Sequence, residues 1–342
     1  MAKVLVTGGC GYIGSHCVVD LIHAGHEVTS VDNYMNSSPN VLESIQKITG
    51  VLVKNHAVDL CNLPAMDKVF SEVRPNAIIH FAALKSVPES VSKPLLYYRN
   101  NLVGVINLLE MQKKFQVKDL IFSSSCSVYG NPSVLPVTED TPMGIAESPY
   151  AHTKQVSEEI MRNFSASHPD FRFIFLRYFN PAGAHDSILM GESPTNEALN
   201  LVPVITETAM GKRSQMWIFG DDYDTRDGTC VRDFIHVMDL AAAHTLSLNR
   251  MTSTDTTGLE IFNLGTGRGI TVKEAIQSFE RISNVTLNYK VGPRREGDVI
   301  SIYSDYTQAA KLLGWKPQRG IDEIMDTAWK WEQVRSKSLS DS

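Results

Sequence analysis

The stretch that decides the expected fold is Thr7-Gly8-Gly9-Cys10-Gly11-Tyr12-Ile13-Gly14. It contains two overlapping glycine patterns, G-x-G-x-x-G starting at Gly9 and G-x-x-G-x-x-G starting at Gly8. Glycines allow a tight turn and a close approach of the backbone to a pyrophosphate, and the N-terminus of a following helix supplies oriented N–H donors. A buried strand is expected over Lys3–Thr7, before the turn, and a helix over residues 11–24, after it. Strand, glycine turn and helix in this order predict a dinucleotide-binding unit.

The second feature is an acidic residue, Asp32, which comes eighteen residues after Gly14 and ends the next expected strand, Glu27–Asp32. A carboxylate at this place accepts hydrogen bonds from the adenosine ribose hydroxyls and would repel a 2′-phosphate. A glycine loop alone is also typical of a flexible turn, but the strand, the helix and Asp32 together favour a binding site. The sequence therefore predicts NAD, rather than NADP, as the cofactor.

Apolar runs alternate with helical patterns through the first half of the chain. The expected strands are Leu52–Val58, Ala77–Leu84, Asp119–Ser123 and Arg172–Tyr178. The expected helices are Leu95–Phe115 and Tyr150–Ser167. Strands that alternate with helices indicate βαβ units and a parallel sheet covered on both faces. We therefore predict the α/β class, with a Rossmann-type doubly wound parallel sheet and a smaller C-terminal mixed α/β domain.

The amino-acid composition changes after Asn180-Pro181, where Pro, Gly, Asn and Asp become frequent. We expect a nucleotide-binding domain over residues 1–180, with return segments near 233–265, and a substrate-binding domain over residues 181–342. The polar stretch after Gln333 is expected to be loose.

Composition narrows the class of protein. Of the 342 residues, 43% are hydrophobic and 20% are charged, which is typical of a globular enzyme. A net charge of −6 argues against nucleic acid as a partner, and no run approaches eighteen apolar residues, so no membrane span is expected. The five cysteines form no C-x-x-C pair and the ten histidines form no HExxH motif, so we expect neither a disulfide framework nor a metal. The N-terminal sequence lacks the pattern of a secretory leader, and the cytoplasm is the expected location.

A second motif, Tyr150-x-x-x-Lys154, indicates proton-transfer chemistry. Positions i and i+4 share a helix face, so the phenol and the ammonium project into the same space, where the cation favours the phenolate. Such a pair also occurs by chance, and its weight comes from the cofactor signature in the same chain. Ser125 belongs to a run of polar residues, Ser123–Ser127, which is either a solvated turn or a source of one hydroxyl for a substrate oxygen. Cys126 inside this run is more typical of a small buried side chain than of a nucleophile.

Together these motifs resemble one known family. Gly8-Gly9-x-Gly11-Tyr12-Ile13-Gly14, Ser125 and Tyr150-x-x-x-Lys154 are similar to the motifs of the extended short-chain dehydrogenases/reductases. Within them the resemblance narrows to the UDP-glucose 4-epimerases and spans nearly the whole chain. The segments that carry it are Val4–His16, Ile79–Ser90, Phe122–Gly130, Ser148–Lys154, Leu176–Ala184, Ile218–Asp239 and Pro293–Asp298.

The resemblance implies an isomerase of galactose metabolism that interconverts UDP-glucose and UDP-galactose at C4, with tightly bound NAD. Tyr150 would take the proton of the sugar 4-hydroxyl while hydride leaves C4 for the nicotinamide. Lys154 would bind the nicotinamide ribose and favour the phenolate, and Ser125 would hydrogen-bond the same sugar oxygen. The 4-keto sugar would turn over in the pocket and receive the hydride on its other face, so no net oxidation results.

The resemblance also assigns ligand-binding positions. The residues implied to contact NAD are Gly8, Gly11, Tyr12, Ile13, Gly14, Asp32, Asn33, Asn36, Ser37, Asp59, Leu60, Phe81, Ala82, Ala83, Lys85, Asn100, Tyr150, Lys154, Tyr178 and Phe179. The residues implied to contact the UDP-sugar are Lys85, Ser125, Ser127, Tyr150, Asn180, Asn200, Leu201, Trp217, Phe219, Arg232, Arg295, Asp298 and Ile302. Among these, Arg232 and Arg295 would bind the phosphates, Asp298 the uridine ribose and Phe219 the uracil.

Two positions depart from the pattern of the family. Ala83 stands where some members carry glycine, and Ile302 stands where members carry either tyrosine or a smaller residue. The family pattern is that bulk at the second position excludes N-acetylated sugars. Our hypothesis for the intermediate Ile302 is therefore weak but measurable activity on UDP-N-acetylglucosamine.

Two other functions stay open on the same scaffold. A nucleotide-sugar 4,6-dehydratase needs an acidic dipeptide directly after the catalytic serine or threonine, where this chain has Cys126 and Ser127. A non-catalytic dinucleotide sensor commonly loses the Tyr–Lys pair, which this chain keeps. Both alternatives are therefore less favoured than the epimerase.

The family resemblance further implies the oligomeric state. In a homodimer of this kind, helices around Leu95–Phe115 and Tyr150–Ser167 would pair with those of a second copy. The expected contact is a four-helix bundle.

Overall fold

A seven-stranded sheet is the largest element of the computed structural model, which describes residues 1–195, 197–253, 258–295 and 298–340. All neighbouring strands run parallel, in the order β3-β2-β1-β4-β5-β6-β11. The strands are β1 (Lys3–Thr7), β2 (Glu27–Val31), β3 (Lys54–His56), β4 (Ala77–His80), β5 (Asp119–Ser125), β6 (Arg172–Tyr178) and β11 (Leu259–Leu264). The strand order reverses between β1 and β4, and such a switch point is where doubly wound sheets bind ligands.

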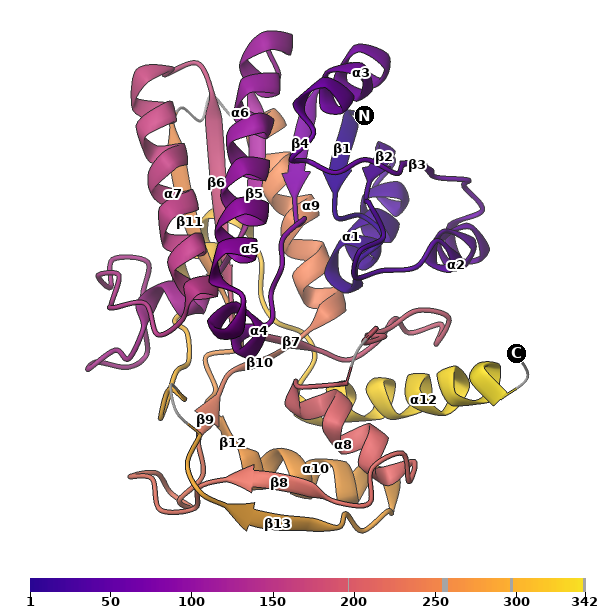
Figure 1. The fold of residues 1–342 in the computed structure, drawn as a ribbon, viewed down its shortest axis with the longest axis vertical. Helices are drawn as coiled ribbons and strands as arrows, with labels where there is room; N and C mark the ends of the chain where they lie inside the picture. Colours follow the sequence, from indigo (N-terminus) through magenta and orange to yellow (C-terminus); the bar gives the residue numbers. More distant parts are fainter. Residues whose placement is uncertain (196, 254–257, 296–297, 341–342) are drawn as a thin grey trace.

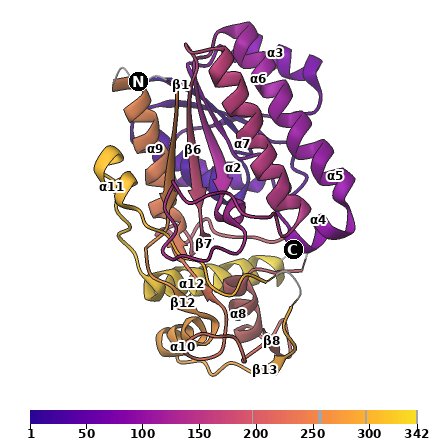
Figure 2. The same cartoon turned by 90° about the vertical axis from the view of Figure 1, so that its left-hand side faces the viewer.

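Helices cover both faces of this sheet (Figures 1 and 2). One face carries α1 (Tyr12–His23), α2 (Asn40–Thr49), α9 (Val237–Ser253) and α11 (Thr307–Leu313), and the other carries α3 (Leu63–Val73), α6 (Gly104–Phe115) and α7 (Pro149–Ser167). Each face has its own apolar core, in which strand residues such as Ile79 and Ile78 are fully buried on opposite sides. No helix within the described ranges is both long enough and apolar enough to cross a bilayer.

The smaller part of the fold lies beyond the carboxyl ends of the large sheet (Figure 1). Its helices are α8 (Leu201–Ala209), α10 (Val272–Ser283) and α12 (Ile321–Ser340). Its two-stranded sheets are β7 (Asn180–Ala182) with β10 (Phe234–His236), β8 (Met216–Phe219) with β13 (Tyr289–Gly292), and β9 (Val231–Arg232) with β12 (Ile270–Thr271). The first two pairs are parallel and the third is antiparallel, so the expected fold, a Rossmann-type sheet with a smaller mixed α/β part, is confirmed.

Two segments after residue 180 return to the large sheet. Helix α9 packs against α1, and β11 pairs with β6 from Leu259 to Leu264. The chain therefore leaves the sheet after β6, builds part of the smaller region, and comes back to complete the sheet. The division into domains at residue 180 stays a prediction.

The expected helix Leu95–Phe115 is confirmed, but it contains a π-helical turn that was not expected. The structure has α4 (Val87–Ser92), α5 (Pro94–Tyr98), a π-helical turn at Arg99–Val103, and then α6. The turn contains Asn101, whose amide donates to Leu84 O at 3.0 Å and to Thr153 Oγ1 at 3.1 Å, while its oxygen accepts from Leu84 N at 2.9 Å. A π-helical turn often marks a functional position, and here it accompanies a buried amide that joins three segments.

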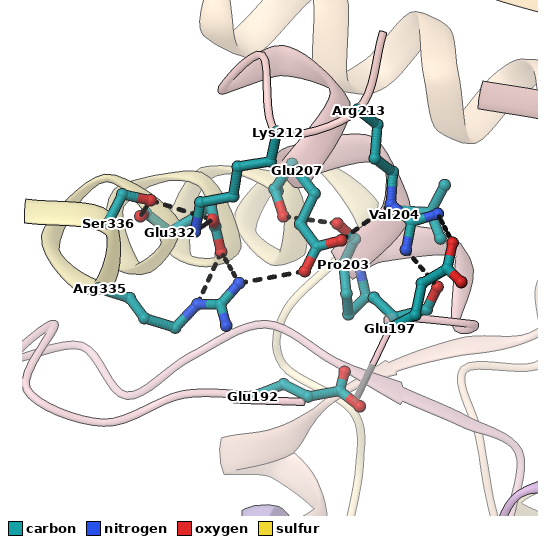
Figure 3. A network of polar contacts seen from close by, with 12 residues as sticks. Glu192, Glu197, Pro203, Val204, Glu207, Lys212, Arg213, Glu332, Arg335 and Ser336 are labelled. Atoms are coloured by element: carbon teal, nitrogen blue, oxygen red, sulfur yellow. Dashed lines mark hydrogen bonds and ion pairs between the residues drawn. The ribbon is translucent and has the colours of Figure 1, made fainter. Parts of the chain in front are cut away.

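Two other boundaries differ from expectation. Strand β4 ends at His80 rather than Leu84, because the N–H groups of Phe81 and Ala82 both donate to Thr7 O, at 2.9 and 3.1 Å, and turn the chain across β1. The stretch after Gln333 is not loose up to residue 340, since α12 continues through it. Arg335 anchors this end of the helix by donating to Glu332 at 2.7 Å and to Glu207 on α8 at 3.3 Å (Figure 3).

Candidate active site

The turn between β1 and α1 brings backbone groups together where side chains would not fit. Gly8 has φ +72°, and a Cβ on it would lie 2.7 Å from Ala82 N. A Cβ on Gly14 would lie 2.1 Å from the carbonyl oxygen of Gly8. Gly11 precedes α1 without a side-chain cap, and the first helical turn carries no acidic residue. The free N–H groups and the positive end of the helix dipole therefore fit an anionic pyrophosphate.

The carboxylate of Asp32 is buried at the end of β2 and held in one orientation. Its Oδ2 accepts from Cys10 N at 3.0 Å, and its Oδ1 accepts from Tyr34 N at 2.9 Å and Ser37 Oγ at 2.8 Å. A carboxylate has about four acceptor positions, so three bonds leave room for a ribose hydroxyl. Three nearby residues were also predicted to contact NAD. Asn33 and Asn36 are exposed, and Ser37 is half-buried.

The loop after β3 carries two of the residues predicted to contact NAD. Asp59 and Leu60 follow β3, and Asp59 Oδ1 accepts from Cys61 N at 2.8 Å. A surface hollow of about 540 Å³ opens here; it is lined by Asp59, Cys61, Asn62, Leu63, Pro64 and Asn107. Asn107 on α6 donates to Leu60 O at 2.8 Å and fixes this side of the hollow.

The predicted catalytic residues come from two neighbouring elements. Ser125 ends β5 and begins a 3-10 turn, Cys126–Tyr129, by accepting from Ser127 N at 3.2 Å. Helix α7 begins after Ser148, whose hydroxyl accepts from Ala151 N at 3.2 Å, so Tyr150 and Lys154 fall in its first two turns. Lys154 Nζ donates to Ser123 O at 2.7 Å and lies 6.0 Å from the centre of the Tyr150 ring. The spacing predicted for one helix face therefore brings both side chains to the end of β5.

Burial sets the acidity of this group. Burial raises the pKa of Tyr150 to about 12, although a hydrogen bond from the Ser125 hydroxyl lowers it in part. Burial lowers the pKa of Lys154 to about 8, and the charge of Glu158 opposes that fall. Burial also raises the pKa of the Cys126 thiol to about 12. Cys126, which is half-buried, is thus protonated at neutral pH, which argues against a role as nucleophile.

Other residues predicted to contact NAD lie around these groups. Phe81, Ala82 and Ala83 follow β4 beside the glycine turn, and Asn100 lies in the π-helical turn next to Asn101. Tyr178 ends β6, and its hydroxyl lies 3.2 Å from His244 Nε2 on α9. Phe179 packs with Val128, Tyr129, Val137 and Ile302 in a small apolar cluster.

Two buried polar atoms in this region have no hydrogen-bond partner within the described residues. They are Ser127 Oγ and Asn180 Oδ1. Both belong to the residues predicted to contact the sugar or the diphosphate. Because a buried polar atom without a partner is costly, each atom fits a partner supplied by a ligand.

A charged cluster lies in the smaller part of the fold. Asp298 accepts from Arg295 at 2.9 and 3.2 Å and lies 3.5 Å from Arg232 Nη2. Arg295 also lies over the ring of Phe219 at 5.2 Å, and Trp217 is exposed on the same strand, β8. Two guanidinium groups share one carboxylate, so the cluster keeps an excess positive charge that suits a diphosphate. The neighbouring positions 296–297 lie outside the described residues.

Glu192 is a residue of the site that the sequence interpretation missed. Its Oε1 accepts from Asn200 Nδ2 at 2.9 Å and lies 3.4 Å from Lys85 Nζ. Lys85 and Asn200 were both predicted to contact the UDP-sugar, and Leu201 begins α8 directly after Asn200. Nothing in the local pattern around Glu192 marks it, because its contact with Lys85 joins segments that are 107 residues apart in the sequence. Within the described ranges, no three His, Cys, Asp or Glu side chains are arranged to hold a metal ion.

Comparisons with known proteins agree with this geometry. A family model described as GDP-mannose 4,6 dehydratase matches residues 5–328. UDP-glucose 4-epimerase of Haemophilus influenzae is 46% identical over 99% of both chains. The chain belongs to the UDP-glucose 4-epimerase family. The resemblance drawn from the motifs is thereby confirmed.

Solved structures of the UDP-glucose 4-epimerase family share the whole fold. The crystal structure of the enzyme from Bifidobacterium longum in complex with NAD+ and UDP has a TM-score of 0.94 at 44% identity, over 98% of this chain and 99% of that chain. The enzyme from Stenotrophomonas maltophila, with bound NAD and formylated UDP-arabinopyranose, has a TM-score of 0.96 at 41% identity, over 99% and 100%. The roles of individual residues in this chain stay predictions.

Proposed function

We propose that this protein interconverts UDP-glucose and UDP-galactose by inverting C4 of the sugar, with NAD held in the site. The observation that carries the proposal is the meeting of Ser125, Tyr150 and Lys154 at the end of β5, at the same edge of the sheet as the glycine turn that follows β1. The membership in the UDP-glucose 4-epimerase family agrees with it. The glycine turn and Asp32 fit NAD, and the charged cluster of the smaller part fits the UDP portion of the substrate.

The chemistry of the site divides between the cofactor and the protein. Bound NAD would supply the acceptor and donor of the C4 hydride. Tyr150 takes the proton of the 4-hydroxyl and later returns it, while Ser125 hydrogen-bonds the same oxygen. A phenol with a pKa of about 12 is ionised in roughly one molecule in 10⁵ at pH 7, so Tyr150 depends on positive charge nearby. Lys154 provides that charge, since a pKa of about 8 leaves its ammonium mostly protonated at pH 7.

Inversion requires that the sugar turn while the rest of the substrate stays bound. We propose that Arg232 and Arg295, which lie together around Asp298, hold the diphosphate, and that the ring of Phe219 next to Arg295 contacts the uracil. We propose that Asp298 accepts from the uridine ribose and that Ser127 and Asn180 supply bonds to the sugar side. Strong contacts to the UDP portion and few to the hexose allow the 4-keto sugar to present either face.

Dehydration is the nearest alternative chemistry, and the residues after Ser125 disfavour it. A 4,6-dehydratase needs an acid and a base at these positions, whereas this chain has a thiol and a hydroxyl. Burial raises the pKa of the Cys126 thiol to about 12, so the thiol cannot serve as the missing acid or base at neutral pH.

One experiment separates the candidate functions. Purified protein is incubated with UDP-galactose without added cofactor, and the products are identified by chromatography. We expect UDP-glucose, at an equilibrium ratio reached from either direction. A 4-keto-6-deoxy product would indicate a dehydratase, and no turnover with NAD still bound would indicate a dinucleotide sensor.

We also propose a homodimer that forms through the helices next to the active site. Apolar side chains are exposed on α4, α5 and α6; they are Val87, Val91, Leu95, Leu96 and Ile106. Leu95 is 80% exposed, which is unusual for leucine and is typical of a surface that a partner covers. Light scattering after size exclusion tests this, and a monomer at micromolar concentration would contradict it.

A cytoplasmic location is the final part of the proposal. All five cysteines are free, and three of them, Cys10, Cys17 and Cys230, are buried. Free thiols persist in a reducing compartment. Fractionation of cells that express the protein would test the location.

A further inference from the structure

A buried ion pair between Glu158 and Arg177 begins one helical turn after Lys154 and has no part in the chemistry described above. Glu158 on α7 and Arg177 on β6 are 0% and 2% exposed. Arg177 Nε donates to Glu158 Oε1 at 3.0 Å, and Nη2 donates to Oε2 at 2.7 Å. Stability alone is a weak reason for such a pair, because apolar residues of similar volume often serve as well. What the pair touches is therefore informative.

The first contact of the pair is with the strand that carries the catalytic serine. Ser124 Oγ donates to Glu158 Oε1 at 2.5 Å, and Ser124 lies between Ser123 and Ser125 in β5. The carbonyl of Ser123 accepts from Lys154 at 2.7 Å. Helix α7 is thus fastened to the end of β5 at two points one helical turn apart. Tyr150 lies one turn before the first of them, so both fastenings fix its position relative to Ser125.

The second contact of the pair is with the segment that follows the catalytic serine. Arg177 Nη1 donates to the Tyr129 hydroxyl at 2.9 Å, and that hydroxyl donates to Asn263 Oδ1 at 2.6 Å. Tyr129 ends the 3-10 turn that begins after Ser125. The guanidinium therefore holds α7, β5 and the 3-10 turn in one network. Each donor and acceptor named in it is satisfied, which is the condition under which a buried polar network is rigid.

Electrostatics links the same pair to Lys154. The ionisable groups around Lys154 and the neighbouring Tyr150 are Glu158 on α7, His80 on β4, Tyr178 on β6 and Cys126 on the 3-10 turn. Two cations face Glu158 in turn: Arg177 and, at 3.4 Å, Arg162 one turn further along α7. Burial raises the pKa of the two phenols and the thiol, and burial together with Lys154 lowers the pKa of His80 to about 3. These four groups are neutral at pH 7. Glu158 is then the anion among them, and it favours the charged form of Lys154.

We propose that Glu158, held by Arg177, is a positioning residue of the active site, which keeps Lys154 charged and holds Ser125 and Tyr150 in register. The inference rests on the proposed function. Glu158 reaches the reaction only through its neighbours and contacts neither ligand. Removal of its charge should therefore change the rate and its pH dependence while leaving substrate binding nearly intact.

The test begins with Glu158→Gln, which keeps the shape and removes the charge. We expect kcat for UDP-galactose to fall about ten- to hundredfold, as small misplacements of reacting groups do, with KM within about twofold of wild type. The alkaline fall of kcat should move to lower pH by about one unit, because an opposite charge has been lost. The titration of Lys154 Nζ followed by NMR, assigned by its absence in Lys154→Met, should show the same displacement without any turnover.

A second variant and a control guard against loss of folding. Ser124→Ala removes the bond to β5 and leaves the ion pair whole, so it should lower kcat without moving the Lys154 titration. The matched control is Asp119→Asn, at the opposite end of the same two strands, where Arg172 donates to Asp119 at 2.6 and 2.8 Å. It should leave kcat and the pH profile unchanged.

The outcomes distinguish the inference from the proposed function. An inactive wild-type protein would refute the function itself. An active wild type with unaltered kcat and pH profile in both Glu158→Gln and Ser124→Ala would overturn the inference alone. An equal displacement of the pH profile in Asp119→Asn would also overturn it, because any buried ion pair would then have the same effect. If Glu158→Gln does not fold, the kcat of Ser124→Ala decides the positioning role.

Discussion

Replacing Gly14 by alanine sets two physical effects against each other. Gly14 lies in the first turn of α1, where alanine ordinarily stabilises a helix by up to about 1 kcal/mol. Its Cβ, however, would lie 2.1 Å from the oxygen of Gly8 and 3.1 Å from Cα of Gly9, and both are backbone atoms that cannot rotate away. Relief of the first contact requires the turn to open by about 1 Å, and overpacking of this kind costs about 1–3 kcal/mol. We expect the steric clash to outweigh the gain in helix propensity, so that the substitution destabilises the protein.

The measurements for Gly14→Ala follow from that displacement. Urea denaturation should show a free energy of unfolding lowered by about 1–3 kcal/mol, and NAD retained after gel filtration should fall, because the backbone donors of the turn have moved. Gly104→Ala is the control: it also lies in a helix, and its nearest contact, Leu60 Cβ, is at 3.4 Å. That variant should be neutral or slightly stabilised. Wild-type stability and NAD content in Gly14→Ala would refute the packing argument.

Three further predictions concern the reaction. Tyr150→Phe should lower kcat by about 10²–10⁴-fold with NAD content unchanged, and near-full activity would refute its role as base. Lys154 loses its charge as the pH rises through its lowered pKa of about 8, so kcat should fall above that pH; a profile flat to about pH 10 would contradict this. Turnover of UDP-N-acetylglucosamine should be measurable but slower than that of UDP-glucose, because the buried Ile302 is intermediate in bulk, and equal rates would exclude this.

The backbone of the nucleotide-binding part was predictable because its strands are buried on both faces. Arg172–Tyr178 forms β6 with the expected bounds, since a run of apolar residues of that length fits a central parallel strand. The same reasoning predicted a strand over Ala77–Leu84 that is too long, because the hydrogen bonds of Phe81 and Ala82 to Thr7 end the strand at His80. The π-helical turn around Asn101 could not be predicted from the sequence, because it depends on contacts with residues distant in the sequence.

The site was predictable where it rests on local spacing. The glycine turn and the Tyr150–Lys154 pair follow from the periods of a turn and a helix, and the structure brings the pair to Ser125. Glu158 continues the same helix face one turn further, so its spacing was a usable signal, yet a lone Glu is ordinarily a solvated charge. Its burial depends on Arg177, which comes from strand β6. Tertiary pairing of this kind leaves no mark in either local sequence.

The place of β11 at the edge of the large sheet has a consequence for synthesis on the ribosome. Until residues 259–264 emerge, β6 is the outermost strand, and side chains such as Phe173 and Phe175 that are buried in the finished protein lack part of their cover. An unpaired apolar edge is prone to aggregation. We therefore expect nascent chains that stop near residue 180 to bind chaperones, and those that extend past residue 264 to be released. Pull-down of stalled chains of both lengths would show whether completion of the sheet is what frees them.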